Sequence, residues 1–106
     1  MFFELRQYRI LNNQMEAWVR LMQEDIIPFQ VSKGMVVVGS FTAPEDPDLF
    51  IWIRRFDSEQ ERERLYKAVY ECAQWKDVIS PKVGQLLDRE HIVVTRLEPT
   101  STSVIH

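Results

Sequence analysis

Residues 49–56, Leu-Phe-Ile-Trp-Ile-Arg-Arg-Phe, form the most hydrophobic segment of the chain. Side chains alternate between the two faces of a β-strand. One face would carry Leu49, Ile51 and Ile53, and the other Phe50, Trp52, Arg54 and Phe56. A strand that is apolar on both faces is buried on both. The segment therefore predicts a central strand whose sheet is covered on each side.

A second strand is predicted over Phe2–Ile10, at the start of the chain. Its alternation puts Phe3 and Leu5 on one face, and Glu4, Arg6 and Tyr8 on the other. The second group joins an acid, a base and a phenol. Charged side chains on a central strand persist only when they are paired, so this face needs partners.

Two segments show the spacing of amphipathic helices. The first covers Gln14–Val31, with Asn13 as the predicted N-cap and Gly34 as a left-handed residue after its end. The second starts after Ser58, which forms a capping box with Glu61. Ser80-Pro81 interrupts the pattern that follows, which predicts one broken helix or two short ones.

Two further strands complete the predicted elements. Met35–Phe41 is β-branched, and Gly39 within it predicts a bulge or a close approach by another group. The last strand is predicted over Glu90–Leu97. We expect residues 1–98 to form one domain and residues 99–106 a flexible tail, because the end of the chain is polar.

Composition excludes several classes of protein. The 106 residues suit a single domain, and a net charge of −3 with mixed signs does not give the basic face that nucleic acids need. One cysteine cannot form an intrachain disulfide, and no apolar run is long enough for a membrane span. We expect a cytoplasmic protein. No residues have the spacing of metal ligands, and no cofactor motif is present, so we expect neither a metal nor a cofactor.

The order of elements, strand-helix-strand-strand-helix-strand, predicts an α+β, ferredoxin-like βαββαβ fold. Its four-stranded antiparallel sheet would carry both helices on one face. We expect the face with Phe3, Leu5 and Ile51 to meet the helices. The opposite face, with Tyr8 and Trp52, is too aromatic to lie bare, so we expect a homodimer that packs two sheets face to face.

Several short motifs together resemble the NIPSNAP family. They are Phe3–Tyr8, Gly34-Met35 with Gly39, Ser58-x-x-Glu61-Arg62 and the Trp75 segment, and the similarity extends to about Leu97. The resemblance implies a ferredoxin-like monomer within the dimeric α/β-barrel superfamily, whose two sheets enclose a cavity. Related barrels include cofactor-independent monooxygenases, haem-degrading enzymes and small decarboxylases or isomerases. The resemblance implies no particular reaction for this chain.

The Glu4, Arg6 and Tyr8 face has two interpretations. As a catalytic cluster, Arg6 or Arg54 would hold a carboxylate or enolate, and Tyr8 would donate to a developing oxyanion. Glu4 or His91 would then transfer the proton. As a structural cluster, Glu4 would form an ion pair with Arg6 or Arg54 at the dimer interface.

Phe50, Trp52 and Arg54 are the predicted ligand-binding residues, because a planar ligand can stack on Trp52 beside the guanidinium of Arg54. The sequence thus predicts a small, partly apolar or aromatic ligand in a cavity over the sheet, with oxygenase or isomerase chemistry as an option. The alternative is a non-enzymatic interaction module whose sheet face is only a packed homodimer interface.

Overall fold

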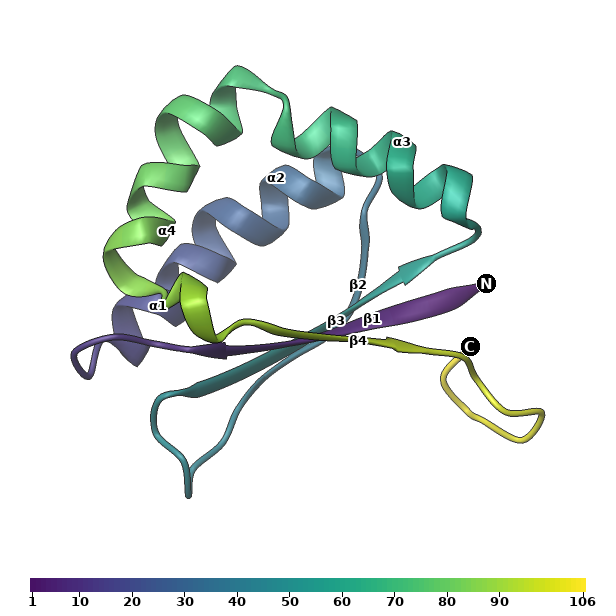
Figure 1. Cartoon of the computed structure of the whole chain (residues 1–106), viewed down its shortest axis with the longest axis horizontal. Coiled ribbons are helices and arrows are strands. Elements are labelled where there is room, and N and C mark those ends of the chain that lie inside the picture. The colour runs from purple at the N-terminus through teal and green to yellow at the C-terminus, as the bar shows by residue number, and fades with distance from the viewer.

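The computed structural model describes all 106 residues and shows a single sheet with helices along one of its faces (Figure 1). The strands are β1 (Phe2–Arg9), β2 (Val36–Thr42), β3 (Leu49–Phe56) and β4 (Val93–Leu97). They pair antiparallel in the order β2-β3-β1-β4. This arrangement confirms the predicted ferredoxin-like α+β fold, in which β1 and β3 are the central strands.

The helical layer contains two long helical stretches (Figure 1). The first comprises α1 (Met15–Leu21), the π-helical segment η1 (Met22–Ile26) and α2 (Ile27–Ser32). The second comprises α3 (Glu59–Tyr70), the π-helical segment η2 (Gln74–Ile79) and α4 (Ser80–Leu86). None of these helices is long and apolar enough to cross a bilayer.

A proline follows each π-helical segment. Pro28 lies in the first turn of α2 after η1, and Pro81 lies in the first turn of α4 after η2. Proline has no backbone N–H and cannot donate the regular helical hydrogen bond. The π turn accommodates this loss, because it locally replaces the regular bonding pattern without ending the helix. The predicted interruption at Pro81 is therefore a change of helix type.

The ends of the helices follow their predicted signals in two of three cases. Gly34 has φ = +107°, and the Ser58 side chain accepts a hydrogen bond from the Glu61 N–H at 3.1 Å, as predicted. Asn13 was wrongly predicted to cap α1. It lies in a turn with φ = +56°, a conformation that asparagine tolerates, and Gln14 takes the N-cap position without a capping hydrogen bond from its side chain.

The predicted assignment of the sheet faces is wrong. The even-numbered residues of β1 and β3 face the helices: Tyr8 packs on Trp18, and Arg54 bonds to Tyr70. The odd-numbered residues, including Leu5, face away from the helices. The reason is that both faces are hydrophobic, so alternation separates two groups of residues without saying which group meets the helices.

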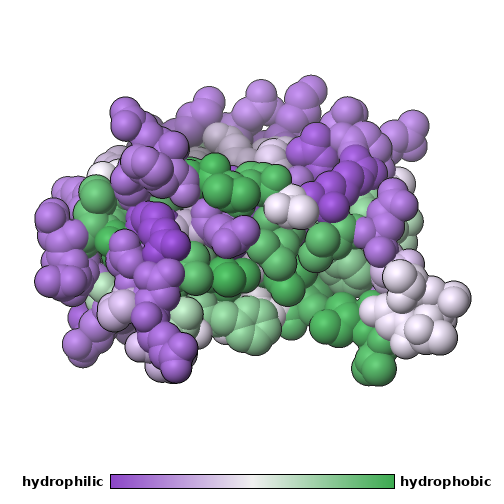
Figure 2. All heavy atoms as spheres, turned by 60° about the horizontal axis from the view of Figure 1, so that its bottom comes forward, coloured by the Kyte–Doolittle hydropathy of each residue, from purple (hydrophilic) through white to green (hydrophobic).

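The face of the sheet away from the helices is hereafter called the open face. It carries aliphatic and aromatic side chains along all four strands. They include Leu5, Ile51, Ile53, Phe41 and Val93, which strand pairing places together. Phe41 is 54% exposed and Val93 is 51% exposed. Figure 2 shows hydrophobic side chains gathered on this side of the molecule, bordered by hydrophilic ones.

Gly39 has the two roles that the sequence predicts for it. The register between β2 and β3 shifts between Val37 and Gly39, which marks a β-bulge. The ring of Phe41 also lies over Gly39, where an added Cβ would come within 2.6 Å of it. The absence of a side chain at Gly39 thereby lets the ring of Phe41 approach the backbone of β2 closely.

Candidate functional site

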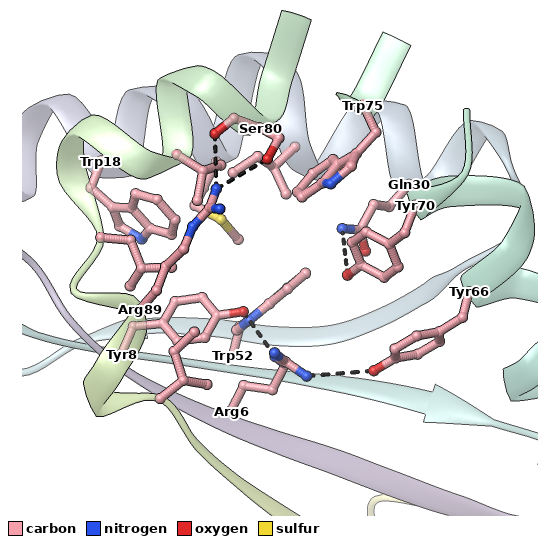
Figure 3. A pocket seen from close by; sticks show the side chains of 15 residues that line it. Arg6, Tyr8, Trp18, Gln30, Trp52, Tyr66, Tyr70, Trp75, Ser80 and Arg89 are labelled. Atoms are coloured by element: carbon pink, nitrogen blue, oxygen red, sulfur yellow. Dashed lines mark hydrogen bonds between the residues drawn. The ribbon is translucent and has the colours of Figure 1, made fainter. Parts of the chain in front are cut away.

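A cavity of about 290 Å³ lies between the helices and the sheet (Figure 3). Its walls contain all three tryptophans and all three tyrosines of the chain, together with two arginines. The polar and aromatic residues that line it are Arg6, Tyr8, Trp18, Gln30, Trp52, Tyr66, Tyr70, Trp75, Ser80 and Arg89. Aromatic walls with a few convergent polar groups are typical of small-molecule sites.

The first helical stretch supplies one wall. Trp18, Met22, Ile26 and Gln30 recur at every fourth position and all line the cavity. In a regular α-helix, residues four apart advance about 40° beyond a full turn, so such a row would drift around the axis. The wider turn of η1 offsets this drift and keeps the row facing the sheet. Trp75 of η2 lines the cavity from the second helical stretch.

A buried ion network lies beside the cavity, and Arg54 is its centre. Arg54 is 0% exposed, and its Nη2 lies 3.1 Å from Glu4 Oε1 and 2.8 Å from the Tyr66 hydroxyl. Its Nη1 donates to the Tyr70 hydroxyl and to Gln30 Oε1, both at 2.9 Å. Glu4 pairs with Arg54 at 3.1 Å and with Arg6 at 3.9 Å, so both predicted partners lie beside it, but within the chain's own core.

Tyr66 is the donor that completes this network, through a 2.6 Å hydrogen bond to Glu4 Oε1. Burial raises the pKa of the Tyr66 phenol to about 12. The Arg54 charge acts against this shift, and the hydrogen bond to Glu4 acts with it. The native state therefore holds the phenolic proton more tightly than the unfolded chain does.

This difference predicts a loss of stability at high pH. An unfolded tyrosine loses its proton near its ordinary pKa of 10, whereas folded Tyr66 keeps its proton until about 12. The free energy of unfolding should thus fall as pH rises from 10 to 12. Absorbance titration of phenolate should show a late-titrating component, and Tyr66→Phe should remove it. A titration unchanged by Tyr66→Phe would contradict this assignment.

Two arginines line the cavity itself. Arg6 Nε donates to the Tyr8 hydroxyl at 2.8 Å, and Arg6 Nη1 reaches the Tyr66 hydroxyl at 3.4 Å (Figure 3). Across the cavity, Arg89 Nη2 donates to the backbone oxygen and the hydroxyl of Ser80, at 2.9 and 3.0 Å. Arg6 therefore orients a phenol, and Arg89 ties the segment before β4 to α4.

The structure brings three of the seven predicted site residues to the cavity, namely Arg6, Tyr8 and Trp52. The other four do not line it. Phe50 packs against Tyr8 and Trp18, and Glu4 and Arg54 belong to the buried ion network. The predicted position between two subunits is also corrected, because the cavity lies within one chain, under its own helices.

His91 lies outside both the cavity and the strand predicted for it. The last strand was predicted to begin at Glu90, but it begins at Val93. A 3-10 turn, η3 (Arg89–His91), precedes it. The imidazole is exposed, and its Nδ1 lies 2.6 Å from Asp88 Oδ2. The Asp88 side chain also accepts from the Glu90 N–H, so this carboxylate caps the turn.

Sequence reasoning missed the polar contribution of the helices. Tyr66 and Tyr70 are four residues apart on α3, beside the buried Leu65 and Val69. That spacing places both phenols on the helix face that meets the sheet, and it was visible in the sequence. Gln30 ends the row of residues at every fourth position, and no comparable pattern in the sequence indicated that it would be buried beside Arg54.

No three histidine, cysteine, aspartate or glutamate side chains lie close enough together to hold a metal ion. The hydrogen-bonding side chains that line the cavity include two arginines, which only donate, and three tyrosines, whose hydroxyls donate and accept. Chemically, the arrangement can enclose an apolar group and donate hydrogen bonds to its oxygen atoms.

Solved structures share this fold over the whole chain. An Agrobacterium tumefaciens protein aligns with a TM-score of 0.90 at 23% identity, covering 100% of both chains. A NIPSNAP family protein from the same organism aligns with a TM-score of 0.87 at 23% identity, covering 99% of this chain and 98% of the other. At such identities, the similarity shows the fold alone.

A more distant likeness extends beyond these proteins. A putative antibiotic biosynthesis monooxygenase from Nitrosomonas europaea aligns with a TM-score of 0.68 at 11% identity, covering 93% of this chain and 98% of the other. No protein with a curated description matches the sequence. The sequence signature of the NIPSNAP family matches residues 3–103. The chain therefore belongs to the NIPSNAP family.

Proposed function

We propose that this protein binds a small, partly apolar molecule in the cavity between its helices and its sheet. The observation that carries the proposal is the concentration of every tryptophan and tyrosine of the chain around one space of about 290 Å³. That volume is near the lower end of the range for ligand pockets, about 300–1,000 Å³. Apolar and aromatic side chains that line an open space gain contacts when a ligand fills it.

The residues that line the cavity are better suited to binding a ligand than to transferring a proton. The two residues predicted to move a proton, Glu4 and His91, do not line the cavity. Glu4 is held by Arg54 and Tyr66, and His91 is exposed beside Asp88. Arg6 and Tyr8 do line it, and they have the chemistry to stabilise an enolate oxygen. Cofactor-independent oxygenase or isomerase chemistry is therefore the second candidate.

The open face supports a homodimer. A large apolar surface on a small protein usually marks an interaction site, and the sheet offers side chains such as Ile51, Phe41 and Val93. A two-fold axis would place this same surface on both partners. In this proposal the dimer and the ligand use opposite faces of the sheet. The alternative of a non-enzymatic interaction module would therefore account for the open face but not for the cavity.

A thermal-shift screen of small apolar molecules tests the binding proposal. A ligand that binds only the folded state, at 100 times its Kd, raises stability by about 2.7 kcal/mol. We expect such a ligand to raise the melting temperature by several degrees. The library should include aromatic acids, ketones and alcohols, because the cavity combines aromatic walls with hydrogen-bond donors.

Val83→Phe is the variant that locates the binding site. Val83 lines the cavity and is 5% exposed, so a phenyl ring at this position should fill the space and remove the ligand-dependent rise. Val78→Phe is the matched control, since Val78 lies in the neighbouring η2 and is 43% exposed. Equal stabilisation of both variants by the same compound would contradict binding in the cavity.

A further inference from the structure

Two phenols in the cavity have protons without a protein acceptor. The Tyr8 hydroxyl accepts a hydrogen bond from Arg6 Nε at 2.8 Å. The Tyr70 hydroxyl accepts from Arg54 Nη1 at 2.9 Å and from Gln30 Nε2 at 3.3 Å. Each oxygen is thus occupied as an acceptor, and no residue accepts from either O–H. Figure 3 shows both hydroxyls and the Arg6 guanidinium pointing into the same part of the cavity.

Two indoles of the cavity have the same property. Trp18 Nε1 and Trp52 Nε1 are buried, and neither donates to any atom of the protein. Trp18 is 1% exposed and Trp52 is 2% exposed. Buried N–H groups are nearly always paired, because an unpaired one loses its hydrogen bonds to water. Both residues line the cavity, so its walls contain two N–H groups for which the protein supplies no acceptor.

The ionised side chains that line the cavity are all positively charged. Arg6 and Arg89 are the ionised residues that line it, and no aspartate or glutamate does. The ion pair of Arg6 with Glu4 spans 3.9 Å, and the same Glu4 oxygen lies 3.1 Å from Arg54. Arg89 donates to neutral oxygens of Ser80. The cavity therefore carries positive charge that lacks a carboxylate of its own.

We propose that the ligand is an apolar molecule with one carboxylate. The carboxylate lies at Arg6, Tyr8 and Tyr70, and the apolar body lies between Trp18 and Trp75. This inference rests on the proposed binding function and adds the chemical class of the ligand. A carboxylate has only acceptor oxygens, and guanidinium and phenol are suited to donate to them. The charged group faces the sheet, where the donors converge, and the aromatic walls cover the rest.

Calorimetric titration with two matched compounds, 4-butylbenzoate and 4-butylbenzamide, tests the inference. They share an apolar body and differ in the charge of the head group. Because hydrogen bonds to charged groups are stronger than neutral ones, we expect the benzoate to bind at least about tenfold more tightly. Arg6→Met should remove this preference, and Arg20→Met should retain it, since Arg20 pairs with Glu16 on the surface.

The outcomes separate the inference from the function on which it rests. Equal affinity of the wild-type protein for both compounds overturns the carboxylate assignment and leaves binding of an apolar molecule standing. A benzoate preference that survives in folded Arg6→Met also overturns it. Failure of both compounds to bind at millimolar concentration contradicts the proposed function as well. The wild-type comparison requires no variant to fold.

Discussion

Replacing Arg54 with methionine is expected to lower the free energy of unfolding by about 3–5 kcal/mol. The variant removes the closest of the three arginines that pair with the buried Glu4 carboxylate, and it removes the donor to Tyr70 and Gln30. This cost is a large fraction of the 5–15 kcal/mol that stabilises a typical domain. Urea denaturation at a fixed protein concentration measures it, because an oligomer's stability depends on concentration.

Arg64→Met is the matched control for Arg54→Met. Arg64 pairs with Glu61 on the exposed side of α3, so its replacement should cost less than about 1 kcal/mol. Removing Glu4 together with Arg54 should cost less than the sum of the two single changes, because they are direct partners. Equal effects of Arg54→Met and Arg64→Met would show that the buried network contributes no more than a surface pair.

Replacing Ile51 with lysine is expected to convert the proposed dimer into a monomer. Ile51 lies on β3 in the middle of the open face, opposite Gln7 of β1 and Phe41 of β2. A two-fold interface receives the substitution twice, and each buried ammonium costs several kcal/mol. The dimer dissociation constant should therefore rise at least about a thousandfold. Light scattering across a range of protein concentrations measures this change.

Gln23→Lys is the control for Ile51→Lys. Gln23 is exposed on the helical layer, so a lysine at this position adds the same charge away from the open face. It should leave the dimer intact. The ligand-dependent rise in melting temperature should persist in Ile51→Lys, since the cavity lies on the other face of the sheet. A wild-type protein that is monomeric at micromolar concentration would contradict the dimer proposal.

The order and type of the elements could be predicted from the sequence. The hydrophobic run over β3, the left-handed glycine at Gly34 and the cap at Ser58 are local signals, and each acts within a few residues. The positions of β1 and β3 in the sheet follow from the order of the elements. Local chemistry and the order of elements were therefore sufficient for the fold.

Which of the two sheet faces meets the helices could not be predicted in this way. Both faces of β3 are hydrophobic, and the face with Trp52 and Arg54 also carries charge. The deciding interactions are long-range: Arg54 bonds to Gln30 of α2 and to Tyr66 and Tyr70 of α3. A helix that supplies polar partners can cover a charged sheet face, and reading helices only as apolar stripes misses this option.

The same error explains why the candidate site was only partly predicted. Arg6, Tyr8 and Trp52 were identified because they share a face with Arg54 along the central strands. Tyr66 and Tyr70 were missed because they lie on a helix that was read for its apolar residues. The site is formed where the two layers meet, so most of its polar and aromatic residues come from elements that the strand pattern does not describe.

The claim that the ligand binds under the helices, and not on the open face, is tested most directly by proton–nitrogen correlation NMR during a titration with 4-butylbenzoate. Each tryptophan gives one indole N–H signal, and all three line the cavity. We expect the indole signals of Trp18 and Trp75 to move, because the apolar body of the ligand lies between these two rings, while the backbone amides of Phe41 and Val93 stay in place. Stationary indole signals with shifts at Phe41 and Val93 would contradict it.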